Sequence, residues 1–357
     1  MKKKLALIAL CVSALFAFSA CSVQIKTEMT ANWHKNQSYD SAYYELLEYG
    51  ISFTPTEDSD SGITIELDEA NSSYTVMTEA HSGEGFSVPN IYHIHSELKV
   101  AASYVAEKDG QKTVVASFGG ENGEADTLIS DVYFRSLENG NNLEPIYSEH
   151  TVLSHSLTNA TADSLSSRSV WLFNYTVSVS YNDDCSQATV RYTDHYADIP
   201  DEERQVSDYV VKASLTSTQE HTYDKLQKNY SVFDAAQLYF MGRGITFGEE
   251  TSQTVTTVSE AGKNTVTLSC TELSSLSRTF ELDGQAADTN SSFAVSKVKF
   301  SIQNGDIYTG QSRTVTYAQK TSGAENTLYN LPVQIEEPLA YNMGSYIYSL
   351  KSASHTR

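Results

Sequence analysis

The chain has 357 residues, with 24 lysines and arginines against 45 aspartates and glutamates, which gives a formal net charge of −21. So acidic a surface repels nucleic-acid phosphates and anionic lipid headgroups, which argues against a nucleic-acid partner and against a membrane contact made by basic residues. Hydrophobic residues make up 40% of the composition, enough for folded cores, and the length predicts two domains.

The first 21 residues have the pattern of an export signal. Three lysines precede an almost unbroken apolar run from Leu5 to Phe18, which is too short to cross a membrane as a helix. The sequence Phe18-Ser19-Ala20-Cys21 then resembles the lipobox of bacterial prolipoproteins, although that family more often has leucine where Phe18 stands. The resemblance implies a diacylglyceryl group on Cys21 and cleavage before it. The mature protein would then be held by lipid at the extracytoplasmic face of the cell membrane. A plain secretory signal is the alternative.

Removal of the signal peptide, residues 1–20, leaves 21 basic and 45 acidic residues, a net charge of −24. The membrane link must therefore come from the lipid, and residues 21–34 form the lipid-anchored N-terminal segment. Cys11 leaves with the signal, so Cys185 and Cys270 are the two cysteines that could pair. An exported protein can form a disulfide, so a Cys185–Cys270 bridge is possible. Two cysteines are too few for a fold held together by disulfides, and two separate buried thiols are favoured.

Two stretches of the mature chain are nearly the same. DSAYYELLEYGISF spans residues 40–53, and DAAQLYFMGRGITF spans residues 234–247. Further matches follow in the same order: residues 117–127 with 279–289, and SDVYF at 130–134 with SKVKF at 296–300. This shared order predicts an internal tandem duplication. The first copy is about 32 residues longer in the interval 54–117, and an added β-hairpin would fit that insertion.

Each copy is expected to begin with a helix. The first shows helical spacing at Tyr39, Ala42, Tyr43, Leu46, Leu47 and Gly50, and the second at Phe233, Ala236, Phe240 and Met241. Asp40 and Asp234 would lie in the first turns, where the helix dipole favours a carboxylate. Gly50 and Gly244 would end the helices in the left-handed conformation.

The rest of each copy predicts antiparallel strands. In SVWLFNYTVSVSY, residues 169–181, the apolar residues at alternate positions from Trp171 to Tyr181 share one face and polar residues take the other. The face that carries Trp171 is therefore expected to be buried. VTTVSEAGKNTVTLS and SKVKFSIQNGDIYTG predict hairpins, the second turning at Asn304-Gly305. The acidic residues 197–207, with Pro200, predict an exposed linker, and SDYVVKASLTS after it a strand of the second domain.

The predicted fold is therefore α+β and β-rich, with two related tandem domains, each an N-terminal helix packed on an antiparallel sheet. The first domain spans residues 35–196, with the insertion between 54 and 117, and the second spans 208–357. This arrangement is similar in architecture to cystatin-like, NTF2-like and LolA-like domains, although no residue motif here specifies any of them. Two β-sandwiches are the alternative.

Motifs for chemistry are sparse. The sequence has no phosphate-binding loop, no nucleophile elbow and no H-E-x-x-H zinc helix. His93 and His95 lie two apart on a predicted strand and would share a face, where zinc would need a third ligand such as His81 or Glu97. A half-exposed strand with two histidines is the favoured interpretation, so no metal ligand, cofactor or catalytic residue is assigned.

The sequence thus predicts a cell-envelope lipoprotein, modified at Cys21, that binds or scaffolds and is not an enzyme. A carrier or chaperone for an apolar ligand is one alternative, and a hydrolase of extracellular polymer is another. The ligand, the oligomeric state and the role of the insertion that contains His93 and His95 do not follow from the sequence.

Overall fold

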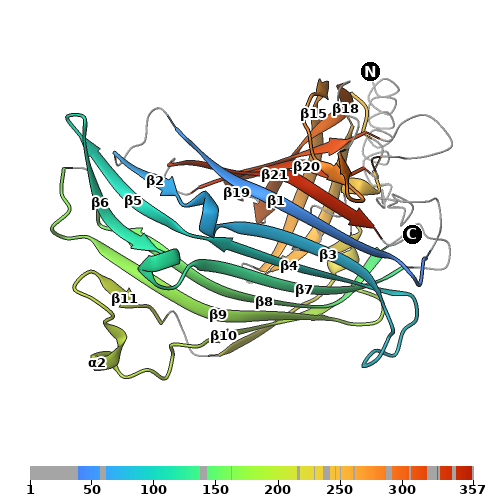
Figure 1. Ribbon diagram of the computed structural model, residues 1–357. Coiled ribbons are helices and arrows are strands. Elements are labelled where there is room, and N and C mark those ends of the chain that lie inside the picture. The colour runs from blue at the N-terminus through green and yellow to red at the C-terminus, as the bar shows by residue number, and fades with distance from the viewer. Residues whose placement is uncertain are drawn as a thin grey trace, which may run out of the picture.

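The computed structural model describes a nearly all-β protein (Figure 1). The described residues are 39–56, 62–136, 143–161, 163–214, 218–228, 230–235, 242–245, 247–249, 251–259, 262–286, 292–304, 307–319, 328, 330–339 and 343–355. Within them 18 strands join into one sheet and three form a second sheet. The described part of the chain contains no helix long and apolar enough to cross a membrane.

The first half of the chain forms a meander of six antiparallel strands. In order these strands are β3 (Ser73–His81), β4 (Ile91–Val100), β7 (Asp126–Ser136), β8 (Leu143–Thr158), β9 (Ser169–Tyr181) and β10 (Ala188–Asp194). Figure 1 shows them as long ribbons that run side by side across the lower part of the molecule. Each strand pairs with the next one in this order, although residues 101–125 separate β4 from β7 along the chain.

The second half also forms a six-stranded antiparallel meander. Its strands are β14 (Ser252–Ser259), β15 (Gly262–Leu276), β18 (Phe293–Asn304), β19 (Ile307–Ala318), β20 (Pro332–Pro338) and β21 (Gly344–His355). The predicted hairpins are confirmed as β14–β15 and β18–β19. Asn304 pairs with Ile307 at the predicted asparagine-glycine turn, and Gly305 itself lies outside the described residues.

Strand β1 (Tyr44–Pro55) joins the two meanders into one sheet. It pairs antiparallel with β3 on one side and with β21 on the other. Short strands pair with both meanders. β12 (Gln219–Tyr223) lies beside β10 and β13 (Val232–Asp234) beside β14, at the outer edges of the two meanders. β11 (Val210–Lys212) lies beside the start of β9, and the hairpin β16 (Glu281–Leu282) with β17 (Gln285–Ala286) lies beside the end of β21. The strand expected in the second domain, β11, therefore pairs with the first half.

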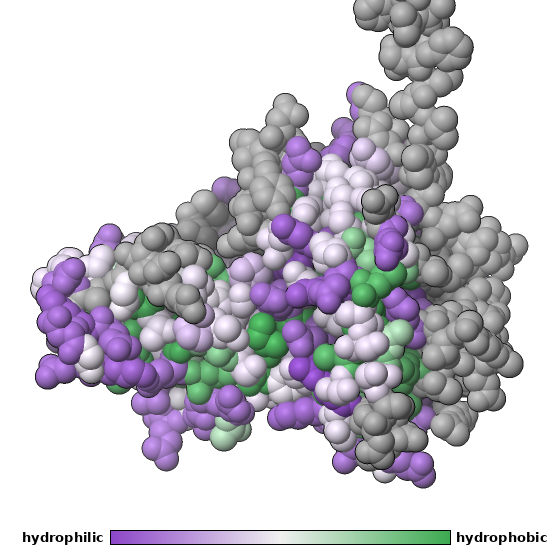
Figure 2. All heavy atoms as spheres, turned by 90° about the horizontal axis from the view of Figure 1, so that it is seen from above, coloured by the Kyte–Doolittle hydropathy of each residue, from purple (hydrophilic) through white to green (hydrophobic). Residues whose placement is uncertain are grey.

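A small sheet of three strands lies at one end of the molecule. It consists of β2 (Ile63–Leu67), β5 (Ala102–Lys108) and β6 (Gln111–Phe118), which lie in the interval 54–117 except for the last residue of β6. Tyr104 of β5 donates a hydrogen bond to the carbonyl of His155 on β8, and Phe118 of β6 stacks on the His155 ring. The tip of the β5–β6 hairpin is charged, and Figure 2 shows this end of the molecule as mainly hydrophilic.

Helical structure is confined to short segments in the described residues. These are the 3-10 turns η1 (Glu69–Asn71), η2 (Gly120–Asn122) and η3 (Leu226–Lys228), the four-residue helix α2 (Asp201–Arg204) within the predicted linker, and helical residues 242 and 243. The strands thus account for nearly all of the described regular structure.

The helix predicted over residues 40–50 is wrong, because this segment forms β1. Its buried side chains alternate: Glu45, Leu47, Tyr49 and Ile51 face the interior. Gly50 lies inside the strand, opposite Ser349, and does not end a helix. The alternation was not recognised in the sequence because one of its interior positions, Glu45, carries a charged side chain.

The second predicted helix is partly outside the described residues. Phe233 and Asp234 belong to strand β13, which corrects the helix at its start, and Ala236, Phe240 and Met241 lie in the undescribed stretch 236–241. Gly244, expected to end the helix in the left-handed conformation, is described but is not among the glycines with positive φ.

Strand β9 is buried on different faces along its length. Val177, Val179 and Tyr181 face the smaller of two apolar clusters, as the alternation predicted. Nearer its start the buried residues are Val170, which packs in the larger cluster, and Leu172, while Trp171 is 38% exposed. The predicted burial of Trp171 is wrong because the strand passes from one core to another that lies on its opposite face.

Candidate functional site

The polar face of the first meander carries the histidines singled out from the sequence. His93 and His95 alternate on β4 and point to the same face, as their spacing predicted. Strand pairing places Tyr133 of β7 opposite His93 and Asp131 of β7 opposite His95. A residue from the neighbouring strand, and not from β4 itself, thus completes the cluster.

Asp131 contacts both histidines through one oxygen. Its Oδ1 lies 2.8 Å from Nε2 of His93 and 2.9 Å from Nδ1 of His95. These three donor atoms all lie within 4.8 Å of one another. The side chains of His93, His95 and Asp131 are 12%, 37% and 34% exposed, so the cluster is half-buried and reachable from solvent.

Two further side chains, those of Tyr133 and Glu79, hold the imidazole of His93 in place. Tyr133 stacks on it with ring centroids 4.4 Å apart and planes 5° from parallel. On the other side, Nδ1 of His93 lies 3.5 Å from Oε1 of Glu79 on β3, at the long limit of a hydrogen bond. The His93 ring therefore has a carboxylate near each nitrogen, which sets its orientation.

Three carboxylates concentrate negative charge here. Glu149 of β8 pairs directly opposite Asp131 and accepts a hydrogen bond from Tyr147. Burial, followed by the charges of Asp131, Glu79 and Glu149, raises the pKa of Tyr133. Burial also acts to raise the pKa of Asp131, but the hydrogen bonds to His95 and His93 outweigh it and lower that pKa. The field at this face therefore favours a cation.

The third ligands considered from the sequence, His81 and Glu97, do not complete the cluster. Nδ1 of His81 accepts a hydrogen bond from the backbone of Gly83, and its ring packs edge-on against Tyr133. Glu97 is exposed and lies opposite Ile129, one facing position beyond His95. The residue that does complete it, Asp131, lies in SDVYF, where Asp131 and Tyr133 share one face of a strand. The sequence did not predict the register that brings this face to the histidines.

A second polar cluster surrounds Glu45, where β1 meets residues of the second half. Glu45 of β1 forms a two-pronged ion pair with Arg243, at 2.5 Å and 2.9 Å, and accepts a hydrogen bond from Nε2 of His355 at 2.8 Å. Nδ1 of His355 in turn lies 3.0 Å from Asp283. Burial acts to raise the pKa of Glu45, but Arg243 and His355 outweigh it and hold that pKa well below its ordinary range.

A third polar cluster joins β13 to β8 and β9. Asp234 is completely buried and accepts hydrogen bonds from Ser148 at 2.6 Å and from Tyr181 at 2.9 Å. Nε2 of His150 lies 3.6 Å from the same carboxylate. Ser148 donates to Asp234 and not to a histidine, so this cluster lacks the serine-to-histidine contact of a nucleophilic triad.

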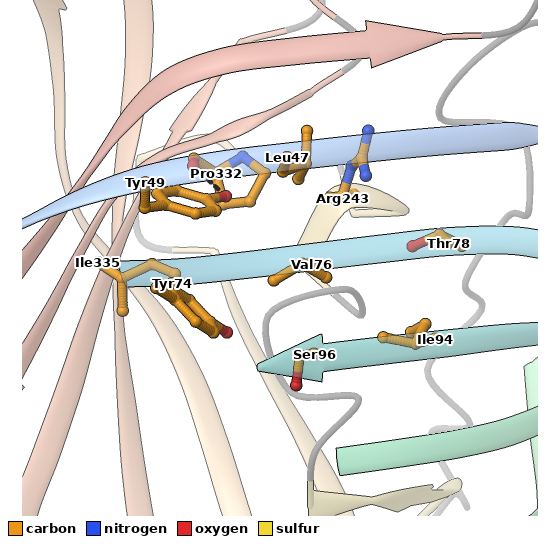
Figure 3. A pocket seen from close by; sticks show the side chains of 10 residues that line it. All are labelled: Leu47, Tyr49, Tyr74, Val76, Thr78, Ile94, Ser96, Arg243, Pro332 and Ile335. Atoms are coloured by element: carbon orange, nitrogen blue, oxygen red, sulfur yellow. Dashed lines mark hydrogen bonds between the residues drawn. The ribbon is translucent and has the colours of Figure 1, made fainter. Parts of the chain in front are cut away.

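Core side chains from both halves surround a small cavity (Figure 3). The strands β1, β3 and β4 contribute Tyr49, Val76 and Ile94, and the second half contributes Pro332 and Ile335. Its volume is about 30 Å³. That is far below the roughly 300–1,000 Å³ of small-molecule sites. This hollow does not support the carrier alternative.

The cysteines occupy separate places. Cys185, in the β9–β10 turn, is buried, and Cys270, on β15, is half-buried, and both are free thiols. Cys185 lines a polar hollow of about 150 Å³, together with Phe86, Arg135 and Asp183. Arg135 there is already paired with Glu144 and donates to the carbonyl of Asp183. The predicted lipid attachment residue, Cys21, lies outside the described residues.

No protein-family model matches the chain, and no match to it was found among curated proteins. One solved structure that resembles it is a β-barrel-like protein of a domain of unknown function, DUF1849, from Brucella abortus. The two chains are 8% identical, with a TM-score of 0.42, and the match covers 89% of this chain and 100% of the other. The similarity is too low to carry any inference about function.

Proposed function

We propose that the protein is a lipid-anchored component of the bacterial cell envelope, attached through Cys21, that binds or scaffolds other molecules and is not an enzyme. The observation that carries this proposal is the order of features in residues 1–21: three lysines, a short apolar run, two small residues and a cysteine. A mature charge of −24 makes a basic membrane contact unfavourable, so the acyl chains would supply the attachment.

Binding is favoured over catalysis by the way the described polar groups are used. The buried clusters at Glu45 and Asp234 are occupied by contacts between strands, which is what the fold requires of buried charges. A hydrolase needs polar groups that converge in a cleft around the substrate. The histidines that such an enzyme would use, His93 and His95, lie instead on a sheet face between Glu79 and Asp131.

We also propose that the two meanders are the two copies of the duplicated unit. Each contains six antiparallel strands in chain order, and the matching segments SDVYF and SKVKF fall on the third strand of each, β7 and β18. The β5–β6 hairpin lies between the second and third strands of the first meander. The much shorter β16–β17 hairpin occupies the same place in the second. Divergence of this connection accounts for part of the length difference between the copies.

The anchor is tested by labelling bacteria that express the full chain with radioactive or alkyne-tagged palmitate. The wild-type chain and a Cys11→Ala variant should both incorporate label and fractionate with membranes, because Cys11 belongs to the signal that is removed. A Cys21→Ala variant should lose the label. Equal labelling of Cys21→Ala and wild type, or no labelling of either, would contradict the proposal.

A further inference from the structure

The cluster on the polar face of the first meander has the composition of a metal site. Two imidazole nitrogens and a carboxylate oxygen converge from two adjacent strands, and all three atoms lie within 4.8 Å of one another. Imidazole and carboxylate are ordinary ligands of Zn²⁺, and three protein ligands with an open fourth position are typical of zinc sites that bind water or another molecule. This cluster is independent of the lipid anchor and of the buried ionic clusters.

The distances require little rearrangement for an ion to enter. Ligand atoms at the usual zinc bond lengths of about 2.0–2.2 Å lie roughly 3.4 Å apart in a tetrahedral site. Oδ1 of Asp131 now lies 2.8 Å and 2.9 Å from the nitrogens of His93 and His95. These contacts would open by about half an ångström, and the two histidine nitrogens, which lie within 4.8 Å of each other, would settle at the same spacing.

The groups around the cluster have the arrangement that supports metal-bound histidines. A histidine that ligates a metal usually donates its other ring nitrogen to a carboxylate or a carbonyl, which fixes its orientation. His93 presents Nε2 to Asp131 and Nδ1 to Glu79, and Tyr133 holds the plane of its ring. The carboxylate of Glu149, directly opposite Asp131, adds negative charge without occupying the donor atoms.

We propose that His93 Nε2, His95 Nδ1 and Asp131 Oδ1 bind one divalent transition-metal ion, with Zn²⁺ as the preferred probe. The fourth position faces the solvent beside His95 and Asp131, which are each more than a third exposed. The ion would there hold water or an anionic group of a partner. Glu79 acts through His93 by positioning its ring. The proposal goes beyond the lipoprotein function, because the ion gives this face of the sheet a specific ligand.

The test uses the full chain without a histidine tag, extracted in detergent and stripped of metal with a chelator. Zinc affinity is measured by competition with a chromogenic chelator, and Co²⁺ is added to record visible absorption bands of the bound ion. The wild type should bind one ion. His95→Ala and Asp131→Asn should each lose more than about 100-fold in affinity, and Glu79→Gln should lose roughly 10–100-fold.

The matched control is His221→Ala, which removes a histidine from the exposed strand β12. This variant should bind zinc as the wild type does. Circular dichroism of each variant establishes that the fold is kept, and His95 is exposed enough for the alanine to be tolerated. If the wild type binds no ion, or if His95→Ala and Asp131→Asn bind as tightly as His221→Ala does, the three residues form a hydrogen-bonded cluster and the proposal is wrong.

Discussion

Removing one partner of the ion pair between Glu45 and Arg243 should strongly destabilise the junction between the halves. The two side chains are 0% and 1% exposed, and they share two contacts at 2.5 Å and 2.9 Å. Glu45→Gln keeps the size of the side chain but removes its charge, which leaves the guanidinium buried without an anion. Breaking one partner of such a pair costs about 3–5 kcal/mol. That is a large share of the roughly 5–15 kcal/mol that holds a typical domain folded.

The assay is urea unfolding followed by circular dichroism, with the free energy of unfolding taken from linear extrapolation. The matched control is Glu66→Gln, because Glu66 also pairs with a cation, Lys112, at 2.8 Å but on the surface. This control should leave the unfolding free energy within experimental error, since exposed pairs are screened by water. A third variant, Glu45→Leu with Arg243→Met, should recover part of the loss because it removes both charges of the pair, although Nε2 of His355 loses its acceptor.

The pH dependence gives a second measurement on the same residue. The folded state holds the pKa of Glu45 below its unfolded value of about 4.3. The stabilisation by the ionised carboxylate is therefore complete above that pH, and it decreases as the pH falls below about 4.3 toward the folded pKa. The difference in unfolding free energy between wild type and Glu45→Gln should shrink in this acid range. A difference that is absent at pH 7, or that grows on acidification, would refute the reasoning.

Two further predictions concern thiols and glycines. Burial raises the pKa of Cys185 to about 12 and also raises the pKa of Cys270, but Cys270 is the more exposed thiol. Native protein at pH 8 should therefore react with an aromatic disulfide reagent at Cys270. The reaction should disappear in Cys270→Ser and persist unchanged in Cys185→Ser. The opposite pattern would mean that Cys185 is the accessible thiol and would contradict the prediction. Gly119→Ala should destabilise more than Gly110→Ala by roughly 1–3 kcal/mol in thermal unfolding. Both have positive φ, but a Cβ at Gly119 would lie 2.5 Å from that of Ala101 whereas the site at Gly110 is open. Equal losses would contradict this packing.

The strands could be predicted from the sequence wherever the apolar alternation was complete. The second half of β9 and the hairpins β14–β15 and β18–β19 have regular alternation and turn residues, and they are found where the sequence placed them. β1 failed for a physical reason. Its interior position Glu45 is neutralised by Arg243 and His355, which lie 198 and 310 residues away. No local pattern announces a buried charge whose partners are so distant.

The candidate site was predicted only in part, because one of its residues comes from a strand that is distant in the sequence. The spacing of His93 and His95 fixes that they share a face, because alternate residues of any strand do. The residue that meets them, Asp131, depends on which strand lies beside β4 and in which register. The two strands β5 and β6 are inserted before that neighbour, so it begins 26 residues after the end of β4. The pairing of β4 with β7 across an inserted hairpin depends on the tertiary structure, and the periodicity of a single sequence does not predict it.

The three polar clusters also differ in what they do for the fold. Those at Glu45 and Asp234 each tie a strand of one half to residues of the other. Buried charges add little net stability, but a displaced register leaves them unpaired, so they favour one closure of the sheet. The cluster at His93 joins β4 and β7, which belong to the same meander, so its charges do not link the two halves. The metal site proposed above would give these charges a different role.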